Sequence, residues 1–405
     1  MLRVAVALFL AQLGYHAYVA SLPLALLHAG RPDALIGALM GAAALIQIPA
    51  AFLAGGLIDR LGGRAVFVGS AASFLGAATL LAAGLAAPGG WLPALVLVRL
   101  LQGVGLAAAM PAALSLVPGL VAPSRLATGL SLASLAGNVS LAIAPPASLA
   151  IVAATSFQLL STLVLAAVAG GLALGWTLPR RAPAAPAHDT SPSGSPDPAP
   201  PRRPGLGRRV SGAFRPAWRP SWALLLLGTV LYLAHWGVLT GYLPQRAAAA
   251  GADVGFLFTA DAVSLMVLRL PFAWLADRVP THGLVVAGLL VTIGALVVLL
   301  LPLTTASMVL AGVGTGGGAA LILPPLTVEI SRRSDETDRG SAFALYSVAF
   351  AVGTAGGSIG LAPLIDRIGF ETALWLGIAG LAAAIAATLA DRRLVRARAT
   401  AAAAT

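Results

Sequence analysis

The sequence predicts an all-α integral membrane protein with twelve transmembrane helices, arranged as two pseudo-symmetric halves of six. Hydrophobic residues make up 59% of the 405 residues, charged residues only 10%, and the mean hydropathy is +0.92. Soluble domains are roughly half apolar and a quarter charged. Apolar runs of bilayer-spanning length follow one another, and they are continuously apolar instead of alternating, which favours helices over a closed barrel.

Twelve runs are long enough to cross a bilayer. The first, with Arg3 ahead of it, superficially resembles a signal peptide, but its length and the second span that follows at once favour a helix that stays. Prolines at 145–146 and 324–325 are expected to kink their helices. The expected spans are 3–29, 35–58, 65–87, 91–117, 126–150, 155–178, 221–245, 253–276, 282–302, 305–330, 340–365 and 370–391.

One polar segment divides the chain. Residues 179–220 are rich in Pro, Ser, Gly and Arg and too poor in apolar residues to pack a core, so we expect a disordered cytoplasmic linker. It separates an N-terminal six-helix half, 1–178, from a C-terminal six-helix half, 221–392. The remaining residues, 393–405, are expected to form a cytoplasmic tail.

The two halves also resemble each other. Asp59-Arg60 recurs as Asp277-Arg278 at an offset of 218, and Pro145 recurs as Pro363 at the same offset. Matching positions on either side of a central linker indicate a duplicated six-helix unit. Repeats of this kind build transporters, whose substrate site lies between the repeats near the bilayer midplane.

The arginines predict orientation, because the chain has no lysine. Arg31, Arg246 and Arg367 fall on one face, Arg99 and Arg269 fall inside helices, and the other arginines fall on the face that both termini share. The positive-inside rule then places both termini in the cytoplasm. The net charge of +11 favours anionic lipid headgroups over nucleic acid, since the basic residues lie in separate loops. The Ala/Gly/Arg bias suggests a bacterial cytoplasmic (inner) membrane.

The loop after the second span has the sequence GGLIDRLGGRAV, residues 55–66. It resembles the GxLaDRxGRr signature of the major facilitator superfamily, which implies secondary transport and a cytoplasmic latch formed by an acid and its basic partners. The resemblance assigns this latch to Gly55, Asp59, Arg60, Gly62 and Arg64, with a weaker second copy at Asp277 and Arg278. At Gly63 the family usually has Arg or Lys. The alternative is a charged loop that only fixes topology.

The fourth span contains Arg99-Leu-Leu-Gln102-Gly-Val-Gly-Leu-Ala, which resembles the RxxQGxGxA pattern of proton-coupled, exporter-like branches. Arg99 is expected to lower the pKa of a nearby acid or to bind an anion, or else to fix helix packing. In the fifth span, Pro145 matches the exporters' GxxxGPxxGG pattern, but Ala144 and Ser148 replace glycines. Asn138 is expected to bind substrate or to bond between helices.

Other polar residues inside spans are candidates for the substrate or proton pathway. Asp261 is the one clearly intramembrane acid and is the candidate proton carrier, unless it is simply hydrated near the surface. Arg269 is expected deep in the same span. His16 and His235 fall at nearly equivalent places in the two halves, where an imidazole suits proton transfer, although a structural histidine is the commoner outcome. Glu329 is expected to be a solvated charge at a helix end.

Enzyme chemistry has little support. The chain has no cysteine, no lysine for a phosphate-binding loop, and no histidine cluster, so we expect neither cofactor nor metal. The glycine run 312–318 lies in an apolar span, which favours close helix packing or a hinge over nucleotide binding.

The sequence therefore predicts a monomeric secondary transporter working by alternating access, with a small-molecule substrate, protons and membrane lipids as its partners. Proton-coupled efflux of a small organic compound is favoured. Two alternatives remain: proton-linked uptake of a metabolite or organic anion drawn to Arg99 and Arg269, and a non-transporting membrane sensor with the same fold.

Overall fold

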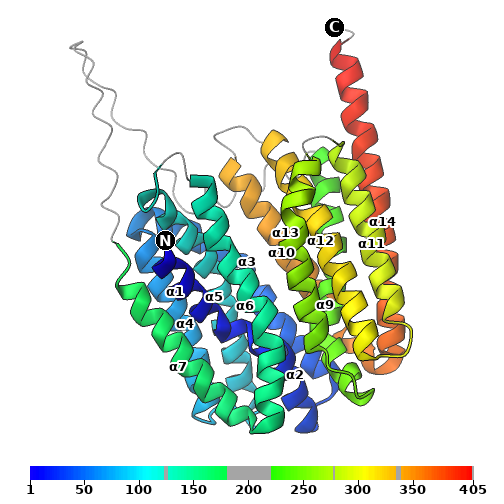
Figure 1. The fold of residues 1–405 in the computed structure, drawn as a ribbon. Helices are drawn as coiled ribbons and strands as arrows, with labels where there is room; N and C mark the ends of the chain where they lie inside the picture. Colours follow the sequence, from blue (N-terminus) through cyan, green and yellow to red (C-terminus); the bar gives the residue numbers. More distant parts are fainter. Residues whose placement is uncertain (123–125, 180–219, 277–278, 334–338, 404–405) are drawn as a thin grey trace, which may run out of the picture.

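A computed structural model describes the chain except for residues 123–125, 180–219, 277–278, 334–338 and 404–405. It is a bundle of helices in two groups (Figure 1). The first group comprises α1 (Leu2–His16), α2 (Tyr18–His28), α3 (Asp33–Leu61), α4 (Gly63–Ala82), α5 (Leu92–Leu116), the short η1 (Val117–Gly119), α6 (Leu126–Ala154) and α7 (Phe157–Trp176). The second comprises α9 (Pro220–Ala249), α10 (Gly255–Ala276), α11 (Thr281–Val298), α12 (Thr305–Arg333), α13 (Arg339–Ser358) and α14 (Ala362–Ala403).

These helices confirm the predicted fold class. α1 and α2 together form the first span, and ten spans in the described part of the chain are long and apolar enough to cross a membrane; α10 and α13 complete the twelve. Both chain ends lie at the same end of the bundle, here called the near end (Figure 1). The opposite end, the far end, carries the loops around residues 29–32, 250–254 and 299–304.

The last two spans differ from their counterparts in the first half. The fifth span is one continuous helix, α6, although it contains Pro145 and Pro146. The eleventh ends at Ser358, and the chain then turns into α14, which is interrupted by the positive φ of 74° at Gly369. α14 continues to Ala403, so the segment expected to be a tail from residue 393 is helical over most of its length.

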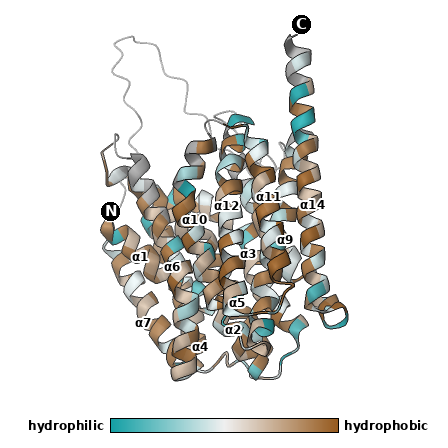
Figure 2. Cartoon of the chain, turned by 45° about the vertical axis from the view of Figure 1, so that its right-hand side comes forward, coloured by the Kyte–Doolittle hydropathy of each residue, from teal (hydrophilic) through white to brown (hydrophobic). Residues whose placement is uncertain are grey.

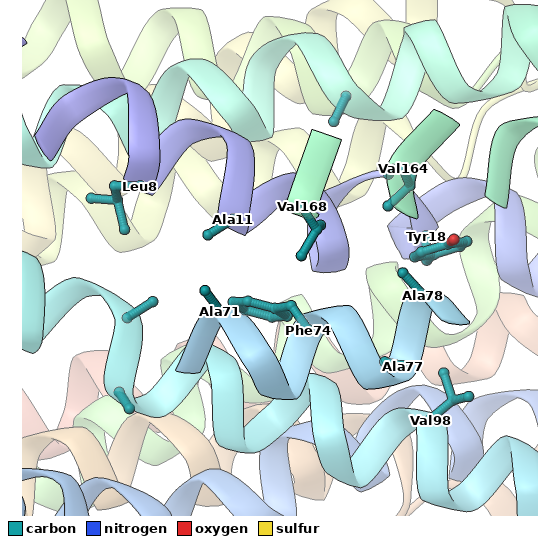
Figure 3. Packing of buried hydrophobic residues seen from close by; sticks show 14 of the residues in the cluster. Leu8, Ala11, Tyr18, Ala71, Phe74, Ala77, Ala78, Val98, Val164 and Val168 are labelled. Carbon is teal, nitrogen blue, oxygen red and sulfur yellow. The ribbon is translucent and has the colours of Figure 1, made fainter. Parts of the chain in front are cut away.

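Each half has its own apolar core. In the first half, Phe74 of α4 packs between α1, α5 and α7, near Ala11 and Val168 (Figure 3). Gly14 and Gly105 make room for its ring, because an added Cβ would lie 2.9 Å and 2.8 Å from Phe74 atoms. Hydrophobic residues also cover most of the helices' length, and hydrophilic residues gather toward the ends (Figure 2). This distribution matches a bilayer's apolar middle and polar boundaries.

In the second half, the glycine run of α12 allows close helix packing, as predicted. A Cβ at Gly312 or Gly316 would overlap backbone atoms of Leu257 and Asp261 in α10. On the other side, a Cβ at Gly314 would lie 2.7 Å from that of Ala295 in α11. Small residues thus let α10, α11 and α12 approach until their backbones touch, which is how helices gain packing energy in lipid.

Candidate substrate cavity and proton site

The two halves are sealed against each other at the far end. Arg246 of α9 forms an ion pair with Asp33 of α3, with 3.2 Å between Nη2 and Oδ2. Across the other side of the seal, the Thr259 hydroxyl of α10 donates a hydrogen bond to the Ala142 carbonyl of α6 at 2.9 Å. The first turn of α10 also touches α6, where an added Cβ at Gly255 would lie 2.8 Å from Pro146 Cα.

Glycines of α3 complete this seal. A Cβ at Gly37 would overlap the Tyr242 ring of α9, and one at Gly41 would lie 2.5 Å from Ile359 Cγ1 and closer still to Ser358 Oγ. The Tyr242 hydroxyl in turn donates a hydrogen bond to the Ser358 carbonyl. These contacts between described residues of the two halves close the structure at the far end.

Toward the near end from this seal lies a cavity of about 350 Å³ between the halves. Both halves contribute: α1, α2, α3, α5 and α6 on one side, α9 and α13 on the other. Its walls combine amide, hydroxyl, imidazole and aromatic groups with small apolar side chains. The lining residues that carry these functional groups are Gln12, Tyr15, His16, Gln47, Asn138, Trp236, Thr240, Phe350 and Thr354.

Two predicted pathway residues, His16 and Asn138, are brought together in this cavity. His16 is buried, and its Nδ1 lies 3.0 Å from the Ser140 hydroxyl of α6. His235, its counterpart by sequence, is not among the lining residues: its ring packs on Tyr232 at 5.0 Å between centroids, and its Cβ faces Gly377 of α14. The neighbouring Trp236 lines the cavity in its place.

Arg99 is completely buried beside the cavity, where it ties three helices together. Its Nε and Nη2 donate hydrogen bonds to the carbonyls of Leu39 and Met40 in α3, at 3.1 Å and 2.8 Å. Its Nη1 donates to Gln102 Oε1 at 2.6 Å, and Gln102 Nε2 donates to a carbonyl of α1. The guanidinium lies 5.2 Å from the centre of the Tyr15 ring, so Tyr15 shields it from the cavity.

Asp261 lies in the second half, away from the cavity lining. The residue is 5% exposed and lies beside α12, where an added Cβ at Gly316 would overlap its carbonyl oxygen. No cationic partner for it is found in the described part of the chain. Two residues earlier on the same helix, Thr259 makes the hydrogen bond across the far-end seal. Arg269, predicted deep in this span, is exposed and is not among the cavity-lining residues.

A sequence model described as the Major Facilitator Superfamily matches residues 4–249 and again 225–404. The chain belongs to the Major Facilitator Superfamily. Solved structures that share its fold include two transporters. The nucleoside transporter NupG is 13% identical, with a TM-score of 0.76 covering 96% of this chain and 99% of that one. The peptide transporter POT in complex with alafosfalin is 15% identical, with a TM-score of 0.75 covering 97% and 95%.

Membership in this superfamily makes the chain a secondary transporter and not an enzyme.

The superfamily motif at residues 55–66 forms the turn between α3 and α4 at the near end. Gly62 has φ +84° and makes the turn, while an added Cβ at Gly63 would lie 2.9 Å from the Ala112 carbonyl of α5. Gly63 thus fits where the family usually has Arg or Lys because a side chain would collide with α5. An added Cβ at Gly55, in contrast, meets nothing within 4 Å.

Only some of the charged side chains of this superfamily motif belong to the described residues. Arg60 is exposed, and Arg64 lies 5.8 Å above the Trp176 ring of α7 in the same half. The side chain of Asp59 lies outside the described residues, as do Asp277 and Arg278 of the second copy. The latch assignment therefore stays a prediction.

The near end of the second half also holds a cluster of charged side chains that was not predicted from the sequence. Arg333 of α12 pairs with Glu329 at 3.0 Å and with Asp391 of α14 at 2.6 Å, and His282 of α11 lies 3.0 Å from Asp391. Burial lowers the pKa of Arg333, but hydrogen bonds and charge from Asp391 and Glu329 outweigh it and the net shift is upward. The expectation that Glu329 is simply solvated is wrong, because the cluster links three helices of one half.

Several cavity residues also escaped the sequence prediction, namely Gln12, Tyr15, Gln47, Trp236, Thr240 and Thr354. The available signal was a polar or aromatic group inside an otherwise apolar span. The predicted pathway residues were histidines, charged residues, Asn138 and Gln102, so this signal was left unused at the other glutamines, the threonines and the aromatic residues.

Proposed function

We propose that this chain is a proton-coupled exporter, moving a small organic compound out of the cytoplasm as protons enter. The observation that carries the proposal is the position of Asp261. A buried carboxyl without a cationic partner among the described residues lies two residues from an inter-half contact of the far-end seal, in a helix that must move when that seal opens. Opening and proton exchange then involve the same helix.

The coupling follows from the cost of burying charge. An ionised carboxylate is expensive at hydrocarbon depth, whereas a carboxyl that reaches water exchanges its proton freely. Opening of the seal displaces α10 as a whole, and we propose that this displacement admits water to Asp261, which lies on the α12 side of that helix, so that it takes up a proton from the far side. Reclosing then buries the neutral acid, and the proton leaves later toward the near side.

Orientation and the exporter motif supply the direction. The positive-inside rule places the near end in the cytoplasm, so the present far-end-closed state is the one that accepts substrate from inside. The pattern beginning at Arg99 resembles that of exporter-like branches. Uptake of an organic anion drawn to Arg99 and Arg269 fits the geometry less well, since the former is shielded by Tyr15 and the latter is not among the cavity-lining residues.

Proteoliposomes with an imposed pH gradient test the proposal. A transported compound should dissipate the gradient, and Asp261→Asn should abolish pH-driven accumulation while keeping exchange of labelled for unlabelled compound. Thr259→Val, which removes the hydroxyl but keeps the carboxyl, is the matched control and should retain proton coupling. Full gradient dependence in Asp261→Asn would overturn the role of Asp261, and accumulation in the same direction as the proton would make the protein an importer.

A further inference from the structure

An apolar groove of about 510 Å³ lies between α1 and α6 toward the near end of the first half, where both helices begin (Figure 1). Leu2 and Leu132, one on each wall, are 77% and 50% exposed, so the groove is open. Its apolar walls suit lipid chains and not water. The described residues that line it are all apolar, namely Met1, Leu2, Ala5, Val6, Phe9, Leu132, Leu135, Ala136 and Val139.

The groove leads toward the central cavity along one face of α1. Leu2, Ala5 and Phe9 line the groove, and Gln12 and His16 line the cavity. Successive members of this set are three or four positions apart, so they form one stripe along the helix. At 1.5 Å per residue, Phe9 and Gln12 are about 5 Å apart along the helix axis. A molecule lying along α1 can therefore occupy both spaces.

Gln12 and Gly137 separate the two spaces. In α6, Gly137 follows the groove residue Ala136 and precedes Asn138, which lines the cavity. An added Cβ at Gly137 would lie 2.6 Å from Gln12 Oε1 and 2.8 Å from Met110 Cε, so the partition consists of side-chain ends against bare backbone. Gln12 Oε1 has no hydrogen-bond partner in the described part of the chain, so rotation of this side chain breaks no bond at that oxygen.

The two spaces differ in chemistry. The cavity of about 350 Å³ is lined by amide, hydroxyl, indole and imidazole groups, whereas the described lining of the groove is apolar. The polar head of an amphiphile cannot cross hydrocarbon cheaply without hydrogen-bond partners. Its chain, in contrast, gains and loses little on leaving lipid for an apolar groove, because lipid chains and the groove are similarly apolar. The cavity thus supplies partners for the head, while the groove keeps the chain in apolar surroundings.

We infer that the groove and the cavity together bind a single-chain amphiphile from the near leaflet, with its head in the cavity and its chain in the groove. This inference rests on the proposed function, because it takes the cavity as the substrate site of the transporter. The head enters as the Gln12 side chain swings away from Gly137. The bound chain points toward the near end, opposite to its direction in the near leaflet, so release at the far end completes a turn-over of the molecule.

Two photoactivatable probes test this inference on the full-length protein in nanodiscs of phosphatidylethanolamine and phosphatidylglycerol. Both are lysophosphatidylcholines: the chain probe carries a diazirine in its acyl chain, and the head probe carries it on the head group. Proteolysis and mass spectrometry locate the adducts after illumination. We expect the chain probe to label residues 1–9 and 132–139, and the head probe to label residues 12–19 and 137–141.

Filling the groove should displace the chain. Ala5→Trp and Val6→Trp each place an indole in the groove from α1, and each should reduce labelling by the chain probe about fivefold or more. Val6 is 37% exposed, so its variant tolerates the ring even where Ala5→Trp disturbs folding. Leu163→Trp in α7 is the matched control, since Leu163 is 48% exposed but is not among the groove-lining residues, and labelling should be unchanged.

Gly137→Val tests the passage past Gln12. Its side chain would fill the space against Gln12 and Met110 and hold the partition shut. The head probe should then no longer label the cavity, while the chain probe still labels the groove. Gly69→Val in α4 is the control, because an added Cβ there meets nothing within 4 Å, and both labelling patterns should persist.

Equal groove labelling in the wild type and both groove-filling variants, or head-probe adducts confined to the near-end surface, would overturn the inference. Two-chain phosphatidylcholine that competes as well as unlabelled lysophosphatidylcholine would also overturn it, because the groove would then hold ordinary membrane lipid. These labelling results need no pH gradient, so they are distinct from failure of the proposed function. Labelling of both spaces, combined with transport indifferent to pH, would keep the amphiphile and remove proton coupling.

Discussion

Gly41 offers a way to open the far-end seal without disturbing either half. It belongs to α3, and the atoms its missing side chain would meet, in Ser358 and Ile359, belong to the opposite half. The Gly41→Ala methyl would lie 2.5 Å from Ile359 Cγ1, whereas ordinary contact begins at 3.4 Å, so the Ser358 and Ile359 side chains must rotate away or α3 and the end of α13 must separate by about 1 Å; we expect separation. The substitution acts as a wedge between halves that move relative to each other.

The magnitude follows from known costs of overpacking. Inserting a methyl into a close contact costs about 1–3 kcal/mol, and here it destabilises only the far-end-closed state. The ratio of open to closed molecules should then rise about 5- to 150-fold, taking 1.4 kcal/mol as a factor of ten.

Electron paramagnetic resonance distances can measure this shift, and the absence of native cysteine allows specific labelling. Spin labels at Thr155→Cys and Ala306→Cys, both exposed at the far end and in different halves, should report a larger fraction of long distances in Gly41→Ala. Gly356→Ala in α13 is the control, because its Cβ would meet nothing within 4 Å. Identical distance distributions in the two variants would refute the argument that the seal at Gly41 is sterically tight.

Three further outcomes are expected. Arg99→Met should lower the free energy of unfolding by about 3 kcal/mol, because carbonyls of α3 lose charged hydrogen-bond donors. Denaturant titration in detergent measures this loss. Loss of transport at unchanged stability would indicate a direct role in transport instead. Asp33→Asn should change far-end distances little, because its pair with Arg246 is partly exposed and worth about 0–1 kcal/mol, and a double-mutant cycle that gives several kcal/mol would contradict this. For an uncharged compound, exchange against one proton should respond to voltage. A potential of 100 mV across the membrane, set by potassium and valinomycin, adds about 2.3 kcal/mol per charge and raises the accumulation ratio about 50-fold, whereas indifference to voltage would indicate electroneutral exchange.

The sequence was sufficient for the spans, the division into halves and the superfamily, because each depends on runs of apolar residues or a short motif. Which way a side chain faces was not predictable. A membrane helix is apolar toward lipid and toward its neighbours alike, so its sequence carries little information about its rotation. His235 illustrates this: its position suggested the cavity, but a rotation of one residue puts Trp236 there instead.

The end of the eleventh span at Ser358, ahead of Pro363, was equally unpredictable from the sequence. Pro145 and Pro363 occupy matching sequence positions, yet α6 continues through the first while the chain has already turned before the second. A proline permits a break without requiring one, so the sequence alone did not distinguish the two outcomes. Buried acceptors such as Gln12 Oε1 also need three-dimensional contacts before their missing partner can be noticed.

The setting of Arg99 has an electrical consequence. Its bonds join α1, α3 and α5, so its charge must travel with the first half as one body, and Asp33, the acid of that half whose side chain is described, lies at the far end instead of beside it. Any displacement along the membrane normal during rocking is then a movement of charge through the transmembrane field. Adsorbed proteoliposomes given a sudden voltage step should show a brief capacitive current even without substrate or a pH gradient, so the conformational change would be observable before any ligand is known.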